Sequence, residues 1–380
     1  MASAYVPGLQ GVVAARTRLS KVDGRRGELV IAGYPLEEIA GRATFEEMVF
    51  LLWNDRLPGA RELEAFRAQL VSVRELPAIT RQVLEAAAAQ KLPAMDALRM
   101  AAGTLSLRTD GEPISDGPYR DALVSVARFA TIVASYGRLL AGEGSIAPHH
   151  GLSHAANYLY MLTGSRPSDA RTRALETYLN TVIDHGLNAS TFAARVIVST
   201  ESDVISAIVG AIGALKGPLH GGAPGPALDM VLEIGRAANA EPFMRAKLDR
   251  GERLMGFGHR IYKVRDPRAD VLSAAAEALF RADGDTELYE LAREVERVAL
   301  RLLDEYKPGR HLRTNVEFFT ALVLQGLGIP VDLFTPTFAV SRVAGWAAHC
   351  LEQLSGNRII RPESEYSGES DRHWVPVERR

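Results

Sequence analysis

Histidine, arginine and carboxylate side chains gather beside glycine or proline in six passages of this 380-residue chain. One of them, K-G-P-L-H-G-G (residues 216–222), follows a long apolar segment and holds His220 between helix-stopping residues. Gly217 and Pro218 fit the end of a helix, and the two later glycines, which lack a Cβ, let the backbone pass close to another group. This setting can present a catalytic imidazole, although an ordinary interhelical turn has the same pattern.

The other five passages combine the same residue types. They are D-H-G-L-N-A-S-T (184–191), G-F-G-H-R-I-Y-K-V-R-D-P-R-A (256–269), T-N-V-E-F-F (314–319), S-R-V-A-G-W (341–346) and R-P-E-S-E-Y-S-G (361–368). Each has a structural interpretation when taken alone: an arginine inside a helix, such as Arg342, commonly satisfies a buried carboxylate. The presence of all six in one chain favours a catalytic site.

Three histidines in one loop, His149, His150 and His154, suggest a metal site as an alternative. No acidic residue or cysteine lies near them in the sequence, and adjacent histidines do not easily bind one ion together. We therefore expect a polar loop here and no metal site. G-F-G-H-R-I does not match a dinucleotide-binding fingerprint either, since the pattern differs and no strand precedes it.

Composition and charge narrow the class of protein. The chain is 47% hydrophobic and 24% charged, as in folded globular proteins, and its length predicts two domains or lobes. The formal net charge is 44 − 46 = −2, and no run of Lys and Arg predicts binding to nucleic acid or to a membrane surface. A few arginines close together are enough to bind a small anion.

The cysteine count and the apolar runs predict the compartment. The single cysteine, Cys350, excludes an intrachain disulfide and a multi-cysteine zinc site, and this suits a reducing cytosol. The first residues lack the basic and apolar regions of a secretory signal. The longest apolar run, V-I-S-A-I-V-G-A-I-G-A-L, is well short of the ~20 residues of a membrane span. We expect a soluble, cytoplasmic protein.

The elements that must position these residues are almost all helices. Residues 27–35 read as a short strand with a Gly/Pro turn, half of a small hairpin. From Leu36 onward the apolar spacing is helical almost throughout. Thr44 is the expected cap of one helix, with carboxylates in the first turn. The expected fold class is mainly α. The remaining predicted helices cover about 61–70, 79–90, 119–140, 168–199, 203–215, 225–236, 242–250, 288–306, 314–327 and 336–354.

In combination and order, the six passages resemble the citrate synthase family, and the match runs nearly end to end. The segments H-G-G-A, G-H-R-x-Y-K-x-x-D-P-R-A and R-P-x-x-x-Y-x-G carry the resemblance, and the length resembles the short bacterial and archaeal form. The resemblance implies a two-domain, multi-helical fold working as a homodimer, with the active site between the domains. The implied large domain covers 1–221 and 326–380, and the small domain covers 222–325.

The implied activity is that of an acyltransferase that converts the acyl group to alkyl on transfer. It condenses acetyl-CoA with oxaloacetate, at the entry to the tricarboxylic acid cycle. Acetyl-CoA is a co-substrate and no further cofactor is implied. The chemistry needs a base for the methyl proton and a donor at the thioester oxygen.

The family motifs give roles to residues of this sequence. His220 matches the donor to the thioester oxygen, Glu317 the catalytic base, and His259 the residue that polarises and protonates the oxaloacetate carbonyl. The implied oxaloacetate contacts are His185, Arg268, Arg342 and Arg361, with Asn188 in support and Arg361 reaching in from the partner subunit. The implied CoA contacts are Lys263, Arg310 and the backbone of Leu254, Met255, Gly256, Phe257 and Gly258.

Two departures from the family pattern bear on rate. The family base is usually aspartate, so the extra methylene of Glu317 moves the carboxylate by about 1 Å, and a misplacement of that size can cost about 10²-fold. In A-P-G-P-A (223–227) the family more often has A-N-E, and Pro224 predicts a different local helix geometry.

Two alternatives stay open. A 2-methylcitrate synthase would use propionyl-CoA, and one methylene is worth only about 1–3 kcal/mol in an apolar pocket. A weakly catalytic paralogue that binds CoA or dicarboxylates is the other alternative, because of Glu317.

Overall fold

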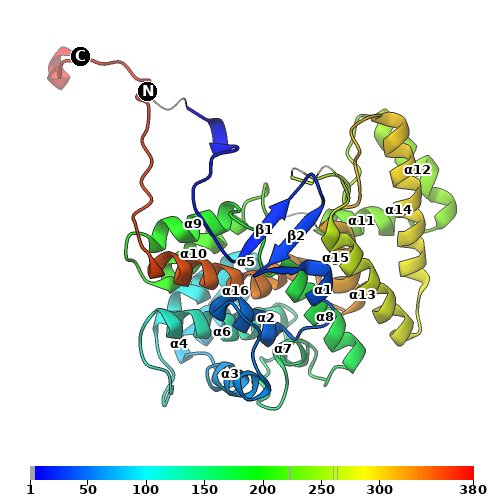
Figure 1. The fold of residues 1–380 in the computed structure, drawn as a ribbon, viewed down its shortest axis with the longest axis horizontal. Helices are drawn as coiled ribbons and strands as arrows, with labels where there is room; N and C mark the ends of the chain where they lie inside the picture. The colour runs from blue at the N-terminus through cyan, green and yellow to red at the C-terminus, as the bar shows by residue number, and fades with distance from the viewer. Residues whose placement is uncertain (1–4, 222–223, 260, 263) are drawn as a thin grey trace.

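A computed structural model describes residues 5–221, 224–259, 261–262 and 264–380 of the chain. Its described residues form sixteen α-helices around a buried apolar core, with one small sheet near the start (Figure 1). The mainly α class predicted from the sequence is therefore confirmed. The helices are α1 (Leu36–Ile39), α2 (Phe45–Asn54), α3 (Ala60–Ser72), α4 (Ala78–Ala89), α5 (Ala94–Gly103), α6 (Pro118–Leu140), α7 (His154–Thr163), α8 (Asp169–Val182), α9 (Ala189–Val198), α10 (Val204–Leu215), α11 (Pro224–Ile234), α12 (Ala240–Asp249), α13 (Pro267–Asp283), α14 (Glu287–Tyr306), α15 (Val316–Gly326) and α16 (Phe334–Ser355). Short 3-10 turns lie at Pro7–Leu9, Thr104–Ser106, Ala237–Asn239, Val331–Leu333 and Val377–Arg379.

Helix starts follow the capping residues in the sequence. Thr44 caps α2 as predicted, in a capping box: its hydroxyl accepts from the Glu47 amide at 3.3 Å, and the Glu47 carboxylate accepts from the Thr44 amide at 2.7 Å. α11 begins at Pro224, where a missing N–H removes no helical hydrogen bond. Pro224 therefore begins a helix and does not break one.

The small sheet has three antiparallel strands in the order β1 (Ser20–Asp23), β2 (Glu28–Ile31), β3 (Tyr34–Pro35). Ser20 pairs with Ile31, and Val30 with Pro35. The predicted hairpin is thus present with a third, two-residue strand added. Leu29 and Ile31 point into the core, so this sheet is anchored on one face.

The β1–β2 turn rests on the loop that joins the predicted CoA and oxaloacetate residues. A Cβ at Gly24 would collide with the carbonyl oxygen of Ile261, and one at Gly27 would lie 2.8 Å from the carbonyl oxygen of Arg265. Gly27 also has φ +70°, which suits glycine. Glycine at both positions allows the turn to touch the loop.

Gly24→Ala should therefore displace the turn or the loop. We expect the free energy of unfolding to fall by about 1–3 kcal/mol, because a methyl group is forced into a filled contact. Urea unfolding measures this change. Gly41→Ala is the matched control, since no atom lies within 4 Å of the position its Cβ would take. An equal loss in both variants would contradict the proposed contact.

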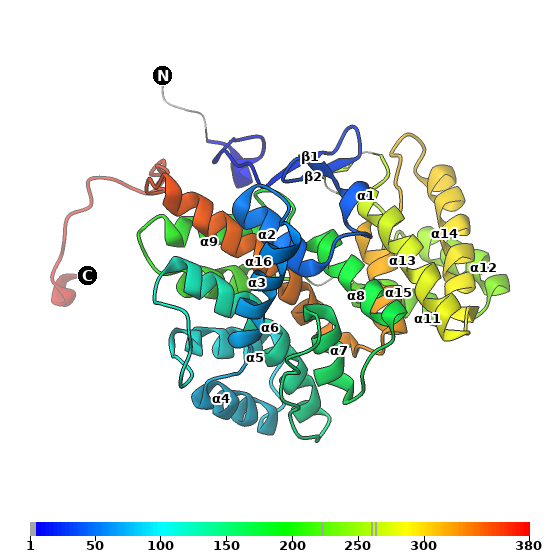
Figure 2. The ribbon, with the colours of Figure 1, turned by 60° about the horizontal axis from the view of Figure 1, so that its bottom comes forward.

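Helix α16 forms the centre of the molecule. It packs against α2, α6, α8, α9 and α10, and most of its side chains from Phe334 to Cys350 are buried (Figures 1 and 2). α6 is long and apolar enough to cross a membrane by length and composition, but 78% of its apolar window is buried inside the protein. Such burial is typical of a core helix.

The helices α11 to α15 gather at one end of the molecule, on the right of Figure 1. There α13 packs on α15 and on α8, and α12 packs on α14. The domain boundaries at 221/222 and 325/326 stay a prediction. After α16 the chain leaves the body as an extended tail (Figure 2).

Candidate active site

Three helices begin at side-chain caps that belong to the predicted site passages. Asn188 caps α9, Asp266 caps α13 and Asn315 caps α15. Two of these starts are joined directly, because the Val316 amide donates to Asp266 Oδ2 at 3.2 Å. Helix N-termini carry partial positive charge and free N–H groups, so this region favours anionic ligands.

His185, His259, Arg268 and Arg342, which lie far apart in the sequence, come together between these helix starts. The rings of His185 and His259 are 6.0 Å apart, and His185 Nε2 lies 3.1 Å from the Tyr262 hydroxyl. Arg268 Nη2 lies 3.3 Å from His259 Nε2. The structure therefore brings these four residues together, three of which (His185, Arg268 and Arg342) the sequence assigned as oxaloacetate contacts.

Hydrogen bonds fix how His259 is presented. The amides of Ile261 and Tyr262 both donate to its Nδ1, at 3.0 and 3.1 Å. Nδ1 is thus an acceptor. Nε2 faces the Arg268 guanidinium, so this edge of the ring and the cation border the same space, which favours an anionic oxygen there.

The two arginines are held by different partners. Asp266 accepts from Nε and Nη2 of Arg268 at 3.0 and 2.8 Å, and both side chains are buried. Arg342 donates from Nε to the carbonyl of Val182 at 2.7 Å and lies over the Phe338 ring, 4.5 Å from its centroid. Burial, with Arg268 nearby, lowers the pKa of Arg342 to about 10, so it stays charged at neutral pH.

The same charges keep His185 neutral. Burial lowers its pKa well below the usual range, and Arg268, Arg342 and His259 lower it further. A neutral ring leaves the positive charge of the two guanidinium groups unchanged and adds a hydrogen-bonding group beside them. This arrangement suits a small dianion.

His220 lies in the turn after α10, where the predicted close approach is found at Gly221. A Cβ there would collide with the carbonyl oxygen of Leu215, and the Gly221 carbonyl accepts from Thr335 Oγ1 at 2.7 Å. Gly222 lies outside the described residues. The Ser190 hydroxyl is 2.8 Å from both His220 Nε2 and Asn188 Oδ1.

Ser190 governs which nitrogen of His220 carries the ring proton. Its hydroxyl donates to Asn188 Oδ1 and accepts from Trp346 Nε1 at 3.0 Å, so it faces His220 Nε2 as an acceptor and the proton of a neutral ring lies on Nε2. To serve a thioester oxygen from Nδ1, the ring needs the Ser190 proton turned from Asn188 to Nε2. Burial, with Arg342, lowers the pKa of His220 to about 4, so the donor is a neutral imidazole at pH 7.

Glu317 lies in the first turn of α15, behind its Asn315 cap. The Glu317 amide donates to Asn315 Oδ1 at 3.0 Å, and Asn315 Nδ2 donates to the Gly258 carbonyl at 2.8 Å. Burial raises the pKa of Glu317 to about 7, with Arg268 and Asp266 acting in opposite directions. A carboxyl with this pKa is well matched to a general base at neutral pH.

The backbone predicted to line CoA pairs with the segment before Glu317. The Gly258 amide donates to the Arg313 carbonyl at 2.7 Å, and the Asn315 amide donates to the Gly256 carbonyl at 3.0 Å. Leu254 is buried, while Met255 and Phe257 are half-buried. A cavity of about 170 Å³ between these segments is lined by His259, Arg310 and Arg313, among others.

Two further predicted residues are Lys263 and Arg361. Lys263 lies outside the described residues. Arg361 lies exposed on the extended tail after α16, and within the described part of the chain no hydrogen bond or ion pair joins it to the other candidates.

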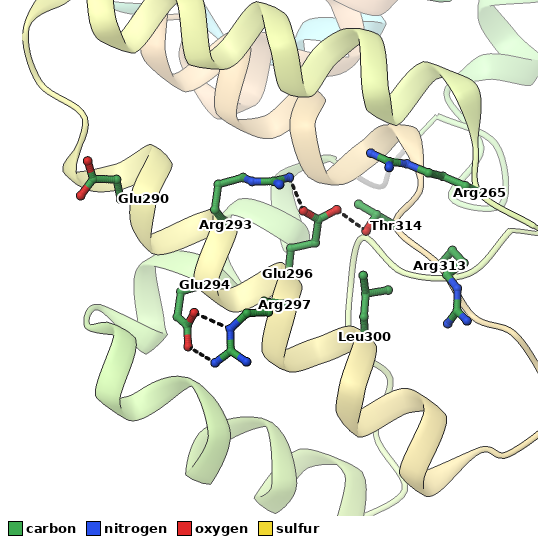
Figure 3. A pocket seen from close by; sticks show the side chains of 9 residues that line it. All are labelled: Arg265, Glu290, Arg293, Glu294, Glu296, Arg297, Leu300, Arg313 and Thr314. Carbon is green, nitrogen blue, oxygen red and sulfur yellow. Dashed lines mark hydrogen bonds and ion pairs between the residues drawn. The ribbon is translucent and has the colours of Figure 1, made fainter.

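A further cavity, of about 740 Å³, is lined mainly by residues of α14, together with Arg265, Arg313 and Thr314 (Figure 3). Its walls are charged and paired internally: Arg293 contacts Glu296 at 2.5 Å, Arg297 contacts Glu294 at 2.6 Å, and Glu296 accepts from the Thr314 hydroxyl at 2.6 Å (Figure 3). None of the predicted site residues lines it.

The three loop histidines have different surroundings. His149 and His150 are exposed, whereas His154 is buried and stacks on Phe45 with centroids 4.8 Å apart. Burial lowers the pKa of His154 to about 3. Within the described ranges, no group of three His, Cys, Asp or Glu residues is placed to hold a metal ion.

Sequence reasoning missed several polar partners. Ser190, Tyr262, Asp266 and Trp346 orient the predicted residues and lie inside the quoted passages, but their types gave no separate signal. A glycine in the same passages, Gly345, packs so closely on Ile183 that a Cβ would collide with the Ile183 carbonyl oxygen.

Comparisons with known proteins agree with this geometry. The family model described as citrate synthase, C-terminal domain, matches residues 8–363. The chain belongs to the citrate synthase family. A citrate synthase of Haloferax volcanii is 40% identical over 379 residues, covering 98% of each chain, and citrate synthase 2 of Bacillus subtilis is 41% identical over 376 residues, again covering 98% of each. A 2-methylcitrate synthase of Mycobacterium tuberculosis is 39% identical over 372 residues, covering 96% of this chain and 91% of its own.

Solved structures of citrate synthases have the same fold. The Pyrobaculum aerophilum citrate synthase superposes with a TM-score of 0.89 at 38% identity, covering 99% of this chain and 95% of its own. A citrate synthase of Thermoplasma acidophilum, solved as a ternary complex with carboxymethyl coenzyme A and oxaloacetate, has a TM-score of 0.86 at 31% identity and covers 98% of this chain and 99% of its own. The family fold implied by the resemblance is confirmed.

Proposed function

We propose that this chain is a citrate synthase that condenses acetyl-CoA with oxaloacetate and hydrolyses the product to citrate and CoA. The cluster of His185, His259, Arg268 and Arg342 carries the proposal, because it provides charge and donors for a four-carbon dicarboxylate. The ligands of the Thermoplasma relative, a CoA analogue and oxaloacetate, support it.

The proposed reaction assigns each step to a side chain. Ionised Glu317 removes a proton from the acetyl methyl group while neutral His220 donates to the thioester oxygen. The methyl carbon then attacks the oxaloacetate carbonyl carbon, and His259 protonates the oxygen as the C–C bond forms. Water finally cleaves the C–S bond and releases CoA as the thiol. These residues account for every proton transfer up to condensation, so no further cofactor is invoked.

We further propose a homodimer in the cytoplasm, with Arg361 completing the site of the partner. Support comes from the tail that carries it: Tyr366, Trp374 and Val377 are 74%, 79% and 68% exposed in the single chain. Large apolar side chains on an extended tail favour contact with another surface. The single buried cysteine suits a reducing compartment.

The deciding assay follows thiol release with oxaloacetate and either acetyl-CoA or propionyl-CoA. A citrate synthase gives the higher kcat/KM with acetyl-CoA, whereas a preference for propionyl-CoA would identify a 2-methylcitrate synthase. Wild-type protein that binds oxaloacetate or CoA but releases no thiol from either thioester would support the paralogue and contradict the proposal.

The pH dependence of kcat/KM should show a single acidic limb. Because the pKa of Glu317 is raised to about 7 and the base acts when ionised, kcat/KM should rise about tenfold per pH unit below 7 and level off above it. His220, with a pKa of about 4, should add no limb between pH 5 and 9. A profile that is flat from pH 5 to 9 would contradict the assignment of Glu317.

A further inference from the structure

Behind the oxaloacetate residues, a chain of polar side chains crosses the core from α9 to α16. Arg195 on α9 donates from Nη1 to Glu352 Oε2 at 2.6 Å and to His349 Nδ1 at 2.9 Å. His349 Nε2 in turn lies 3.2 Å from Asp184 Oδ1. Arg195, His349 and Asp184 are all buried, so water does not replace these contacts.

Donor chemistry fixes the protonation of His349. An arginine side chain has donors only, so the Nδ1 that faces Arg195 must accept. The ring proton is therefore on Nε2, on the side of Asp184 Oδ1. These two atoms lie 3.2 Å apart, and among the described residues neither has a hydrogen-bond partner of regular geometry, so this close contact is the polar contact that they share. His349 is thus a neutral bridge between a buried cation and a buried anion.

Asp184 holds the turn that carries His185 and Asn188. Its Oδ2 accepts from the Ser20 hydroxyl and from the Gly186 amide, the latter at 3.3 Å, and Ser20 Oγ also accepts from that amide at 2.8 Å. α16 lies directly against this turn, because Gly345 has no Cβ to meet Ile183. Asp184 is therefore fixed on one side by β1 and on the other by His349.

Helix α16 also carries Arg342, which lies seven residues before His349 on the same face of the helix. Arg342 also acts electrostatically on the Asp184 carboxylate, which is linked to Arg195 through the imidazole of His349. A shift of Asp184 would move the His185 turn and change the field at Arg342 together.

We propose that His349 is a positioning residue for oxaloacetate: through its 3.2 Å contact with Asp184 it fixes His185 and Arg342, without touching substrate itself. This rests on the proposed function, since the ligand of that pocket is taken to be oxaloacetate. Among the described residues, no hydrogen bond or ion pair joins His349 to His220 or Glu317 at the thioester end of the site, so the effect should fall on one substrate.

The test compares His349→Leu with His349→Gln. Leucine removes both polar contacts, and the KM for oxaloacetate should rise about 10- to 100-fold, because a misplacement near 1 Å is enough for such an effect. The KM for acetyl-CoA should stay within about threefold. Glutamine can accept from Arg195 and donate to Asp184, so His349→Gln should recover most of the oxaloacetate affinity. Asp184→Asn should resemble the leucine variant.

His154→Leu is the matched control, because His154 is also buried in a helix but its ring nitrogens have no hydrogen-bond partner in the described residues. It should leave the KM for oxaloacetate unchanged. If His349→Leu does not fold, His349→Asn takes its place, since its shorter side chain cannot reach both partners.

Two results would overturn the inference: an unchanged KM for oxaloacetate in folded His349→Leu or His349→Asn, or equal changes in the KM of both substrates. Calorimetric titration of wild type with oxaloacetate alone distinguishes failure of the proposed role of His349 from failure of the proposed function. Wild type that fails to bind oxaloacetate refutes the function itself, whereas binding that is equally tight in the His349 variants refutes only the role of His349.

Discussion

Replacing Glu317 with glutamine should lower kcat by about 10²- to 10⁴-fold, the range that a positioned general base contributes. The amide cannot take a proton from the acetyl methyl group, whereas its size keeps the first turn of α15 unchanged. Exchange of the methyl protons of acetyl-CoA with deuterated solvent, followed by NMR in the presence of oxaloacetate, isolates this step from hydrolysis. If Glu317→Gln matches wild type in that exchange, Glu317 is not the base.

The fold of that variant can be checked independently. The folded protein binds the Glu317 proton more tightly than the unfolded chain does, so Glu317 lowers the stability as pH rises from about 4.5 through about 7. Glutamine never ionises, so Glu317→Gln should be at least as stable as wild type at pH 8 by thermal unfolding.

Glu317→Asp tests whether the length of the side chain matters: activity within about tenfold of wild type would show that the site tolerates either carboxylate. Inert wild type beside an active Glu317→Asp would contradict the enzyme assignment of the natural chain.

Replacing Arg268 with methionine should damage both stability and substrate binding. Asp266 would lose its two guanidinium contacts and stay buried as an unpaired anion, so the free energy of unfolding should fall by about 3–5 kcal/mol. The KM for oxaloacetate should rise at least about 10²-fold, because a carboxylate of the substrate loses the same cation.

Adding Asp266→Asn separates the two effects. The double variant removes the unpaired charge, so it should regain much of the stability in urea unfolding while oxaloacetate binding stays weak. If binding recovers along with stability, Arg268 acts only as a structural partner of Asp266.

Local signals predicted much of the fold. The cap at Thr44, the apolar spacing of α6 and α14 and the breaks at proline led to helices within a few residues of their observed ends. The sequence did not place α5, α7 or α13 as separate helices. The predicted helical stretch 168–199 is interrupted by the turn at 183–188, where Asp184 and Gly186 bond to Ser20 on β1. Such a long-range contact has no local signature.

The candidate site, like the fold, was predictable from the sequence only in part. Motifs and their resemblance to a family supplied the identity and the expected roles of His220, His259 and Glu317. The partners that orient them depend on contacts between distant segments, such as Trp346 with Ser190, 156 residues apart in the sequence. The role of Arg361 depends on a second chain, so it stays a prediction.

Cys350, buried next to His349 in the last turns of α16, has a practical consequence for measuring this protein. It is 0% exposed, and burial raises the pKa of its thiol to about 12, so the native thiol is neither reachable nor ionised at neutral pH. A colorimetric thiol reagent should then count released CoA with no background from the native protein. In denaturant the same reagent should react once per chain, so one cysteine makes the activity reagent a probe of unfolding as well.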